Sequence, residues 1–343
     1  MSIKKLFGMV TAALLAGLVF AADIVLNPTH PDRYVVVKGD TLWDISSRFL
    51  RDPWLWPEVW YVNPQIANPH LIYPGDILTL VYVDGKPQLR MQRGYQTVKL
   101  SPHARVEPLD RAIPTIPIDA IKQFLTRPLV VDKDELKAAP YIVASAGEHI
   151  VSGAGDRVYV RGIQGEDEGL FDAFRPGGPY IDPDTNEVLG YEAIYVGTSA
   201  VQQFGDPSTL LLTETTREAR VGDRMRPAEK IAPITHFTPH PPASGTEGRI
   251  ISVHDGVTQI GQFDVVVINR GDADGMEIGH VMKIFQAGEV IKDNVDGRIS
   301  SSVRLPDEEA GLLMVFRTFD RVSFALVMKA TQAIHVLDYV RAP

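Results

Sequence analysis

The stretch Tyr34–Leu80 constrains the fold of this chain more than any other part of the sequence. It opens with the valine-rich run Tyr34–Val37, which favours a strand. Thr41 follows at a position that suits the N-cap of a helix, with an acidic residue three positions later. A second apolar run, Asp76–Leu80, ends the stretch. The pattern predicts a strand, two helices and a closing strand.

The second helix of this stretch has two candidate starts, at Pro53 and at Pro57. Proline is tolerated only in the first turn of a helix, so Pro57 favours the later start. Trp56 and Trp60 then lie about one turn apart on the same face. Pro64 is expected to end the helix, because proline cannot continue it.

Three sequence motifs lie where this arrangement places loops: Gly39-Asp40-Thr41-Leu42, then Asn63 at the end of the second helix, then Asn68-Pro69 with Leu71-Ile72-Tyr73-Pro74-Gly75. Together they resemble the LysM family, whose small modules bind glycans that contain N-acetylglucosamine, such as peptidoglycan and chitin. The resemblance covers the full length of such a module. One departure is the long, tryptophan-rich segment Arg51–Trp60, which could alter the rim of the binding groove.

A glycan site between the two loops agrees with the chemistry of the sugar. An uncharged amide sugar offers a flat apolar face, hydroxyls and an acetamide, and it is best held by apolar surface with a few fixed polar groups. Two loops that meet at one edge of a small domain supply both. The residues predicted to bind the glycan are Gly39, Asp40, Thr41, Leu42, Asn63, Leu71, Ile72, Tyr73 and Pro74.

Some apolar residues of the module have an alternative, purely structural interpretation. Three of the predicted site residues could serve only to pack the loops: Leu42, Ile72 and Pro74. Three tryptophans are expected in the hydrophobic core rather than against a sugar: Trp43, Trp56 and Trp60. Trp54 lies off their common face, and the sequence leaves its role open.

The first residues are typical of a secretory signal peptide over residues 1–21. Lys4 and Lys5 precede the apolar run Leu6–Phe20, which is short for a membrane span, and Ala21 suits the position before cleavage. The chain has no cysteine, which excludes the lipoprotein route. Its formal net charge of −9 disfavours nucleic acid and anionic lipid as partners. A protein outside the cytoplasmic membrane is expected.

The rest of the chain is expected to be a connector followed by β structure. The predicted helix of the connector begins at Ile116-Pro117, places Ile118, Ile121 and Leu125 on one face, and closes at Pro128. The predicted divisions are a LysM module at 31–83, a connector at 84–140, a β domain at 141–228, a proline-rich linker at 229–247 and a β domain at 248–343. The fold class is thus multidomain, a small α+β module followed by a mainly β region.

Strand-like runs recur through both β regions, at Arg157–Ile163, Tyr191–Gln203, Ser208–Thr215, Gly248–Val253, Phe263–Asn269, His280–Phe285, Leu312–Phe316 and Val322–Lys329. The ends of the two regions are similar, which suggests a duplicated β domain. At an offset of 115 residues, four identities pair Thr216, Val221, Asp223 and Arg226 with Thr331, Val336, Asp338 and Arg341. Upstream, Gly190–Ala193 aligns near Gly311–Met314 at an offset of 121.

No catalytic residue, cofactor or metal site is predicted. Among the nine histidines there is no His-x-His or His-Glu-x-x-His motif, and a cysteine nucleophile is missing. His236 and His240 lie in the proline-rich linker, and no carboxylate or cysteine is expected close enough to complete a set of metal ligands with them. Glu148-His149, after Gly147, is interpreted as a turn.

One acidic segment has the first spacings of a calcium loop, at Asp182, Asp184 and Asn186. However, Glu187 occupies the position where such a loop needs glycine. A hairpin turn is therefore predicted there.

The combination of features resembles the family of type IV pilus secretin-associated proteins. These features are a cysteine-free signal peptide, one LysM module and a long tail that ends with Gly311–Ala330. That family joins a LysM module to a tail similar to the C-terminal part of the flagellar protein FlgT. The resemblance implies a periplasmic protein that anchors an outer-membrane secretin, and so the pilus, to peptidoglycan. A homo-oligomeric ring around the secretin is expected, because many weak glycan sites would then act together, and no enzyme activity is expected. The alternatives are a LysM-targeted cell-wall hydrolase and a flagellar or generic envelope scaffold.

Overall fold

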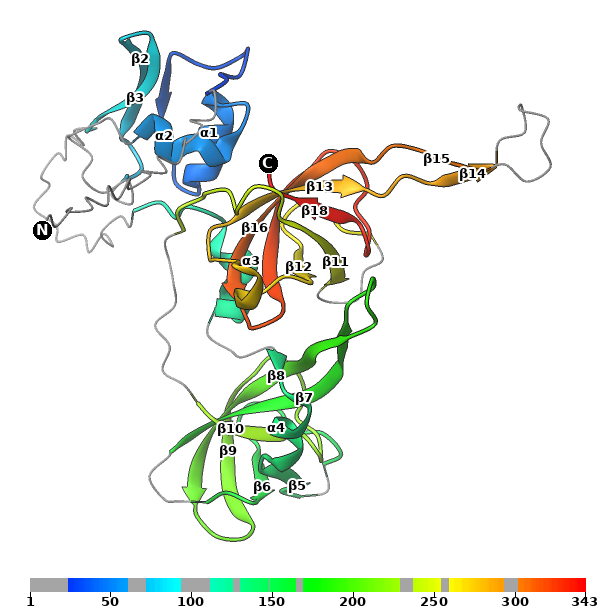
Figure 1. Cartoon of the computed structure of the whole chain (residues 1–343). Coiled ribbons are helices and arrows are strands. Elements are labelled where there is room, and N and C mark those ends of the chain that lie inside the picture. Colours follow the sequence, from blue (N-terminus) through cyan, green and yellow to red (C-terminus); the bar gives the residue numbers. More distant parts are fainter. Residues whose placement is uncertain are drawn as a thin grey trace, which may run out of the picture.

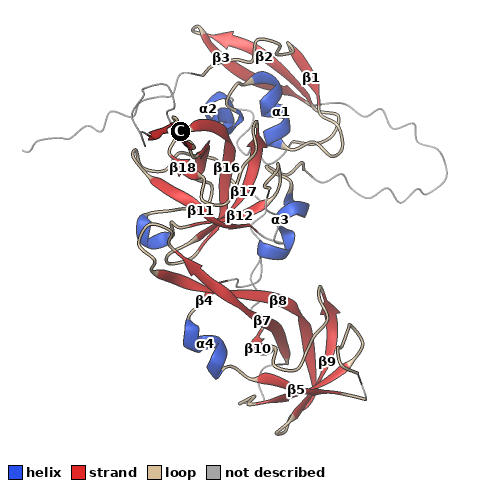
Figure 2. Ribbon diagram, turned by 90° about the vertical axis from the view of Figure 1, so that its right-hand side faces the viewer, coloured by secondary structure: helices blue, strands red, loops and turns tan. Residues whose placement is uncertain are grey.

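A computed structural model of the chain describes residues 24–60, 72–93, 112–125, 130–147, 149–164, 169–228, 237–253, 259–292 and 302–343. Three bodies are stacked along the molecule: an N-terminal module (residues 24–93) and two β-barrels, of which the second in sequence lies in the middle (Figures 1 and 2). The predicted signal peptide lies outside the described residues. Within them, no helix is both long and apolar enough to cross a membrane.

The N-terminal module has the predicted order of elements, extended by a third strand. The elements are β1 (Arg33–Val35), α1 (Leu42–Phe49), the 3₁₀ turn η1 (Pro53–Leu55), α2 (Trp56–Trp60), β2 (Ile77–Val83) and β3 (Lys86–Gln92). The strands pair antiparallel in the order β1-β2-β3. No strand was predicted after residue 83. Asp84 and Gly85 have φ of 50° and 77°, and this pair of left-handed residues makes the tight hairpin that joins β2 to β3.

Local sequence signals explain both helices of the module. The Thr41 hydroxyl oxygen accepts a hydrogen bond from Asp44 N–H at 3.1 Å, so the predicted N-cap is confirmed. Both candidate prolines of the second helix are used. Pro53 opens η1, and Pro57 lies in the first turn of α2. Pro64 lies outside the described residues.

The connector contains helix α3 (Ile118–Leu125), the short strand β4 (Val130–Val131) and helix α4 (Lys133–Ala138). The predicted helix is confirmed, and its apolar face packs on the second barrel. The ring centroid of Phe124 lies 6.1 Å from that of Phe316 and 6.3 Å from that of Phe324. The Arg317 guanidinium also donates to the Phe124 carbonyl at 2.6 Å. Pro128 lies outside the described residues.

The first barrel consists of β5 (Tyr141–Ser145), β6 (Arg157–Arg161), β7 (Leu170–Ile181), β8 (Val188–Gln203), β9 (Ser208–Thr215) and β10 (Arg224–Pro227). The strands pair in the order β8-β7-β10-β5-β6-β9, and a further pairing of β8 with β9 closes the ring. β4 is added beside β8. Apolar side chains from these strands fill the interior, including Ile142, Val158, Phe171, Leu210 and Met225.

The second barrel consists of β11 (Glu247–Val253), β12 (Val265–Ile268), β13 (Val281–Gln286), β16 (Glu308–Thr318), β17 (Ser323–Ala330) and β18 (Tyr339–Arg341), with the short turn η2 (Asp272–Asp274). Its closed order is β11-β12-β17-β16-β13-β18. Strands β14 (Val290–Lys292) and β15 (Ser302–Arg304) form a separate ribbon that projects from it (Figure 1). When the strands of the two barrels are matched in chain order, the circular order is the same, so the barrels share one topology. A mainly β region after a small α+β module is the fold class that the sequence predicts.

Matched backbone hydrogen bonds extend this equivalence to single residues. The carbonyls of Asp223 and Asp338 accept from the first strand of each barrel, at 2.9 Å and 3.0 Å. Thr216 N–H and Thr331 N–H donate to the equivalent strands β8 and β16, at 2.9 Å and 2.8 Å. The 115-residue offset therefore corresponds to real structural equivalence.

The predicted upstream alignment of Gly190 with Gly311 is wrong, because Gly197 takes the place of Gly311. A side chain on Gly197 would collide with the backbone of β9, at Glu214, and one on Gly311 would collide with the equivalent strand β17, at Lys329. Both glycines are required by this close approach of two strands.

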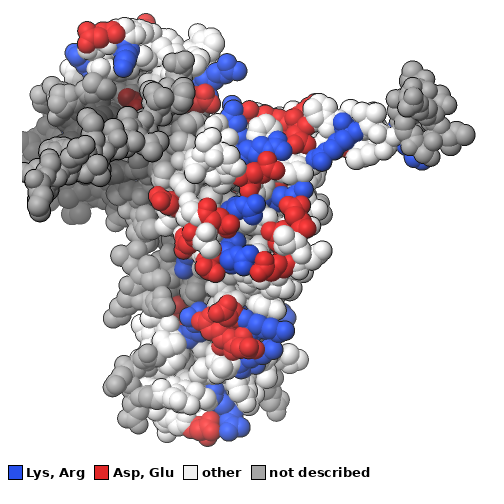
Figure 3. All heavy atoms as spheres, in the orientation of Figure 1, with Lys and Arg blue, Asp and Glu red and all other residues white. Residues whose placement is uncertain are grey.

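The turn between β7 and β8, residues 182–187, joins the two barrels and is the predicted hairpin turn. The Asp182 carboxylate accepts from the Asn269 amide at 2.9 Å. Arg249 pairs with Asp184 and Arg321 pairs with Glu187, each at 3.0 Å. Burial raises the pKa of Asp182, but hydrogen bonds from Asp184 N–H, the Asn269 amide and Thr185 N–H outweigh it, and the net pKa is lowered. Acidic and basic side chains are interleaved over the face of the barrels seen in Figure 3.

The last part of the predicted linker 229–247 is fixed rather than free. Phe237 is 1% exposed and belongs to the main hydrophobic cluster. His240 N–H donates to the Gly279 carbonyl at 3.1 Å, and Val281 N–H donates to the His240 carbonyl at 2.9 Å. The sequence did not indicate this attachment, because Phe237 is an isolated apolar residue without periodicity.

Candidate functional site

The first predicted glycan loop is held by a buried carboxylate. Asp40 Oδ2 accepts from Val37 N–H at 2.9 Å and from the Tyr34 hydroxyl at 3.0 Å. Burial, and then the hydrogen bond to Asp40, raises the pKa of the Tyr34 hydroxyl, which therefore stays a donor. Gly39 has a φ of +99°, a conformation that glycine adopts without strain. The role of Asp40 is thus to position the loop.

The second loop uses the same device, and backbone hydrogen bonds tie it to β1. Asp76 Oδ2 accepts from Tyr73 N–H at 3.0 Å. Gly75 N–H donates to the Val36 carbonyl at 2.8 Å, and Val36 N–H donates to the Asp76 carbonyl at 2.9 Å. The guanidinium of Arg93 lies 5.1 Å from the centre of the Tyr73 ring and 3.6 Å from the Asp76 carboxylate. The two predicted loops therefore meet at one edge of the module.

The predicted site residues differ in what they present to a ligand. Leu42 and Ile72 are fully buried, so each can offer only its backbone, and Thr41 is buried as the cap of α1. Tyr73 and Pro74 are partly exposed and Gly39 is exposed. Asn63 and Leu71 lie outside the described residues, as do Asn68 and Pro69. The structure brings the rest together, and contact of any of them with a glycan stays a prediction.

A segment of the connector, residues 112–116, lies across both loops, and we call it the bridging segment. The carbonyls of Pro114 and Thr115 accept from Leu42 N–H at 2.9 Å and from Trp43 N–H at 3.1 Å. Ile113 N–H donates to the Ile72 carbonyl at 2.9 Å. Sequence reasoning missed this contact, because it is made by the backbone and leaves no side-chain motif.

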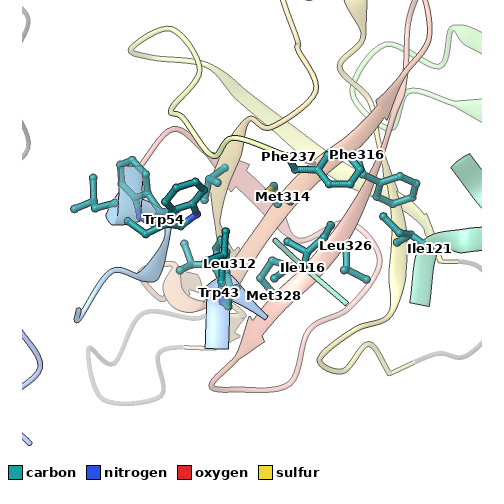
Figure 4. Packing of buried hydrophobic residues seen from close by; sticks show 14 of the residues in the cluster. Trp43, Trp54, Ile116, Ile121, Phe237, Leu312, Met314, Phe316, Leu326 and Met328 are labelled. Atoms are coloured by element: carbon teal, nitrogen blue, oxygen red, sulfur yellow. The ribbon is translucent and has the colours of Figure 1, made fainter. Parts of the chain in front are cut away.

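All four tryptophans are buried, which confirms the core role of Trp43, Trp56 and Trp60 and extends it to Trp54, 8% exposed. Figure 4 shows Trp43 beside Leu312 and Met328 of the second barrel. All three residues belong to one hydrophobic cluster that spans both bodies. The module is thus packed on the second barrel through its tryptophan-rich face, with a cleft of about 370 Å³ left between α1 and β17.

The structure also brings together three potential metal ligands that the sequence did not connect. Ligand atoms of His240, Glu277 and His280 all lie within 4.8 Å of one another. The prediction that no carboxylate lies close to His240 is therefore wrong, because the fold brings Glu277 to it. His280 Nδ1 accepts from Glu277 N–H at 3.1 Å, which places the proton of the neutral ring on Nε2. Burial, then His240, lowers the pKa of His280. A metal would need the opposite tautomer, so the cluster is better explained as packing.

Comparison with known proteins agrees with this geometry. Residues 34–81 match the LysM domain family, so a LysM domain lies near the N-terminus, and LysM is a binding module rather than a catalytic one. The chain is also 38% identical over 64 residues to an uncharacterized protein, YqbP, of Bacillus subtilis. That similarity covers 16% of this chain and 29% of the length of the relative. The family supports binding of peptidoglycan or N-acetylglucosamine and is found in extracytoplasmic, cell-wall-associated proteins.

Proposed function

We propose that the protein binds N-acetylglucosamine-containing strands of peptidoglycan through the two loops of the LysM domain. The observation that carries this proposal is that the family match spans both loops, which backbone hydrogen bonds of Val36 with Gly75 and Asp76 hold side by side. Asp40 and Asp76 each fix the shape of one loop. Tyr73 and Gly39 are accessible there. An amide sugar would stack against Tyr73 and exchange hydrogen bonds with the loop backbone.

Glycan binding is proposed as the whole activity of the module, without catalysis. The chain has no cysteine nucleophile and no His-Glu-x-x-His motif. The His240, Glu277 and His280 cluster belongs to the second barrel rather than to the module. Incubation with purified sacculi is expected to release no soluble fragments. Release of fragments would instead support the wall-hydrolase alternative.

The finer part of the proposal assigns the two barrels to a partner in the periplasm. A single LysM groove offers few contacts to offset the freedom lost on binding. A ring of copies around an outer-membrane secretin would raise the avidity on the order of 10²-fold or more by effective concentration. Loss of twitching on deletion of the gene would support the pilus role, and loss of swimming would favour the flagellar alternative.

Co-sedimentation with sacculi tests the glycan proposal, with Tyr73→Ala as the variant and Tyr82→Ala as its matched control. Tyr82 is 61% exposed on β2 and lies outside both loops. Tyr73→Ala is expected to weaken binding by about tenfold, which corresponds to the loss of about 1.4 kcal/mol. Tyr82→Ala should bind like the wild type. Equal binding by all three proteins would contradict the site.

A further inference from the structure

We propose that the bridging segment, residues 112–116, occupies the glycan groove of the LysM domain, so that the segment and the glycan compete for it. This inference rests on the proposed function, because it assumes that the two loops form the glycan site. The groove in the free chain is therefore closed by the protein's own backbone. The apparent affinity of the groove for glycan therefore depends on the fraction of molecules in which the segment has left it.

The hydrogen bonds of the segment use the polar groups that a sugar would need. Leu42 N–H and Trp43 N–H lie in the first turn of α1, where backbone donors have no partner within the helix. The carbonyls of Pro114 and Thr115 accept hydrogen bonds from these two N–H groups. An acetamide carbonyl or a sugar hydroxyl has the same chemistry and would compete for the same positions. On the second loop, Ile113 N–H donates to the Ile72 carbonyl and so occupies an acceptor that a sugar hydroxyl could use.

The segment is itself buried where it is bonded to the two loops. Ile113 is 4% exposed, and Thr115 and Ile116 are fully buried. Leu42 and Ile72, to which the segment is bonded, are themselves 0% exposed. A sugar ring cannot lie over the backbone of these two residues while the segment remains in place.

One feature of the segment makes the closed state easier to open. The Thr115 hydroxyl is buried and has no hydrogen-bond partner among the described residues. A buried hydroxyl without a partner opposes the closed state, because it gives up its bonds to water. Valine has nearly the shape of threonine without that hydroxyl, so Thr115→Val should hold the groove closed more firmly.

The second barrel presents the segment to the groove. The segment runs directly into α3, which is fixed to the barrel by Phe124 and Arg317. The side chain of Trp43 packs on the same barrel while its N–H binds the segment. Opening the groove therefore loosens the module from the second barrel, which couples glycan binding to the arrangement of the two bodies.

The test measures binding of a soluble chitin hexasaccharide by the full-length protein and three variants. Ile113→Pro removes the N–H that binds the Ile72 carbonyl, and Ile150→Pro is the matched control at an 89% exposed position of the first barrel. If the segment is in place about 90% of the time, Ile113→Pro should bind up to about tenfold more tightly. Thr115→Val should bind more weakly than the wild type, and Ile150→Pro should bind equally.

The outcomes separate this inference from the function on which it rests. Tighter glycan binding by Ile113→Pro together with weaker binding by Thr115→Val would support competition. If Ile113→Pro fails to fold, the affinity of Thr115→Val decides the question. Equal affinity of wild type and Thr115→Val, with no gain in a folded Ile113→Pro, would overturn the inference while glycan binding stands. No binding by any of the four proteins would overturn the proposed function and the inference together.

Discussion

The two barrels share one strand order but differ in how many of their faces are covered. In β9 of the first barrel, buried and more exposed residues alternate along the strand. In the equivalent β17, Ser323–Met328 are buried without interruption. The outer positions of β9 are Thr209, Leu211 and Thr213, and the equivalents in β17 are Phe324, Leu326 and Met328.

The difference shows what a continuous apolar strand means in a barrel. The inner face of the second barrel forms its own cluster, with Leu313, Ala325 and Val327. Its outer face belongs to a different cluster, shared with α3 and the tryptophan-rich side of the N-terminal module. An uninterrupted apolar run therefore marks a strand that is covered on both faces, here by another body of the same chain.

The largest effect is expected from the outer face of β17. Phe324 is 2% exposed and packs near Phe124, Tyr180 and Phe319. Phe324→Ala should lower the free energy of unfolding by about 3–5 kcal/mol through the cavity that it leaves. The matched change on the first barrel, Thr209→Ala, should cost less than about 1 kcal/mol. Calorimetry of both variants checks this contrast, and equal losses would contradict it.

The next effect concerns a device that the barrels share, the aspartate before the last strand. Asp223 Oδ2 accepts from Arg220 N–H and Asp338 Oδ2 accepts from His335 N–H, each at 2.8 Å. Replacing either aspartate by alanine leaves a backbone N–H without its acceptor. Asp223→Ala and Asp338→Ala should therefore each lower the free energy of unfolding by about 1–3 kcal/mol. Asparagine keeps one acceptor oxygen and should cost less. Denaturant unfolding measures both, and a neutral result for one alone would show that the turns are not equivalent.

Smaller effects, opposite in sign between the two barrels, are expected at the residue before each of these aspartates. Gly222 has a φ of +95°, and Leu337 holds the same left-handed conformation at +79°. Leu337 is 48% exposed, so little burial is lost by shortening it. Leu337→Gly should stabilise the protein by roughly 0.5–1 kcal/mol, and Gly222→Leu should destabilise it by about 1–2 kcal/mol. The melting temperatures should move in opposite directions, and a loss in both would contradict the equivalence.

The smallest expected effect is a pH dependence of the folding stability that arises from His280 of the second barrel. Burial, then His240, lowers the pKa of His280 in the second barrel, against the weaker opposing charge of Glu277. The folded state thus favours neutral His280, and its stabilising effect is present above the unfolded pKa of about 6.5 and declines as the pH falls below it. Unfolding curves between pH 7.5 and 5 should show this decline in the wild type. A His280→Gln variant with the same pH dependence would contradict the assignment.

Much of the fold could be predicted because local signals agree with the tertiary structure. The cap at Thr41 and the strand Ser208–Thr215 appear as predicted. β7 was missed because Pro176, Gly177, Gly178 and Pro179 interrupt its pattern, and the irregular pairing there accommodates them. β10 and β18 are too short to stand out.

The candidate site was predictable only where its residues lie close in sequence. Asp40 and Thr41 belong to a short motif, and their positions follow from it. The bridging segment contacts the site through the backbone carbonyls of Pro114 and Thr115. Every residue has a backbone carbonyl, so the sequence contains no side-chain motif for this contact. The cluster of His240 with His280 likewise depends on a backbone pairing that brings distant segments together.

Hydrogen exchange of the full-length protein, with and without chitin hexasaccharide, tests the central claim most directly. We expect changes in exchange in the peptides that cover residues 36–45 and 72–78 of the two loops. The strands of the first barrel should exchange at the same rate in both states. A protein that binds the oligosaccharide with changes confined to the barrels would contradict the account.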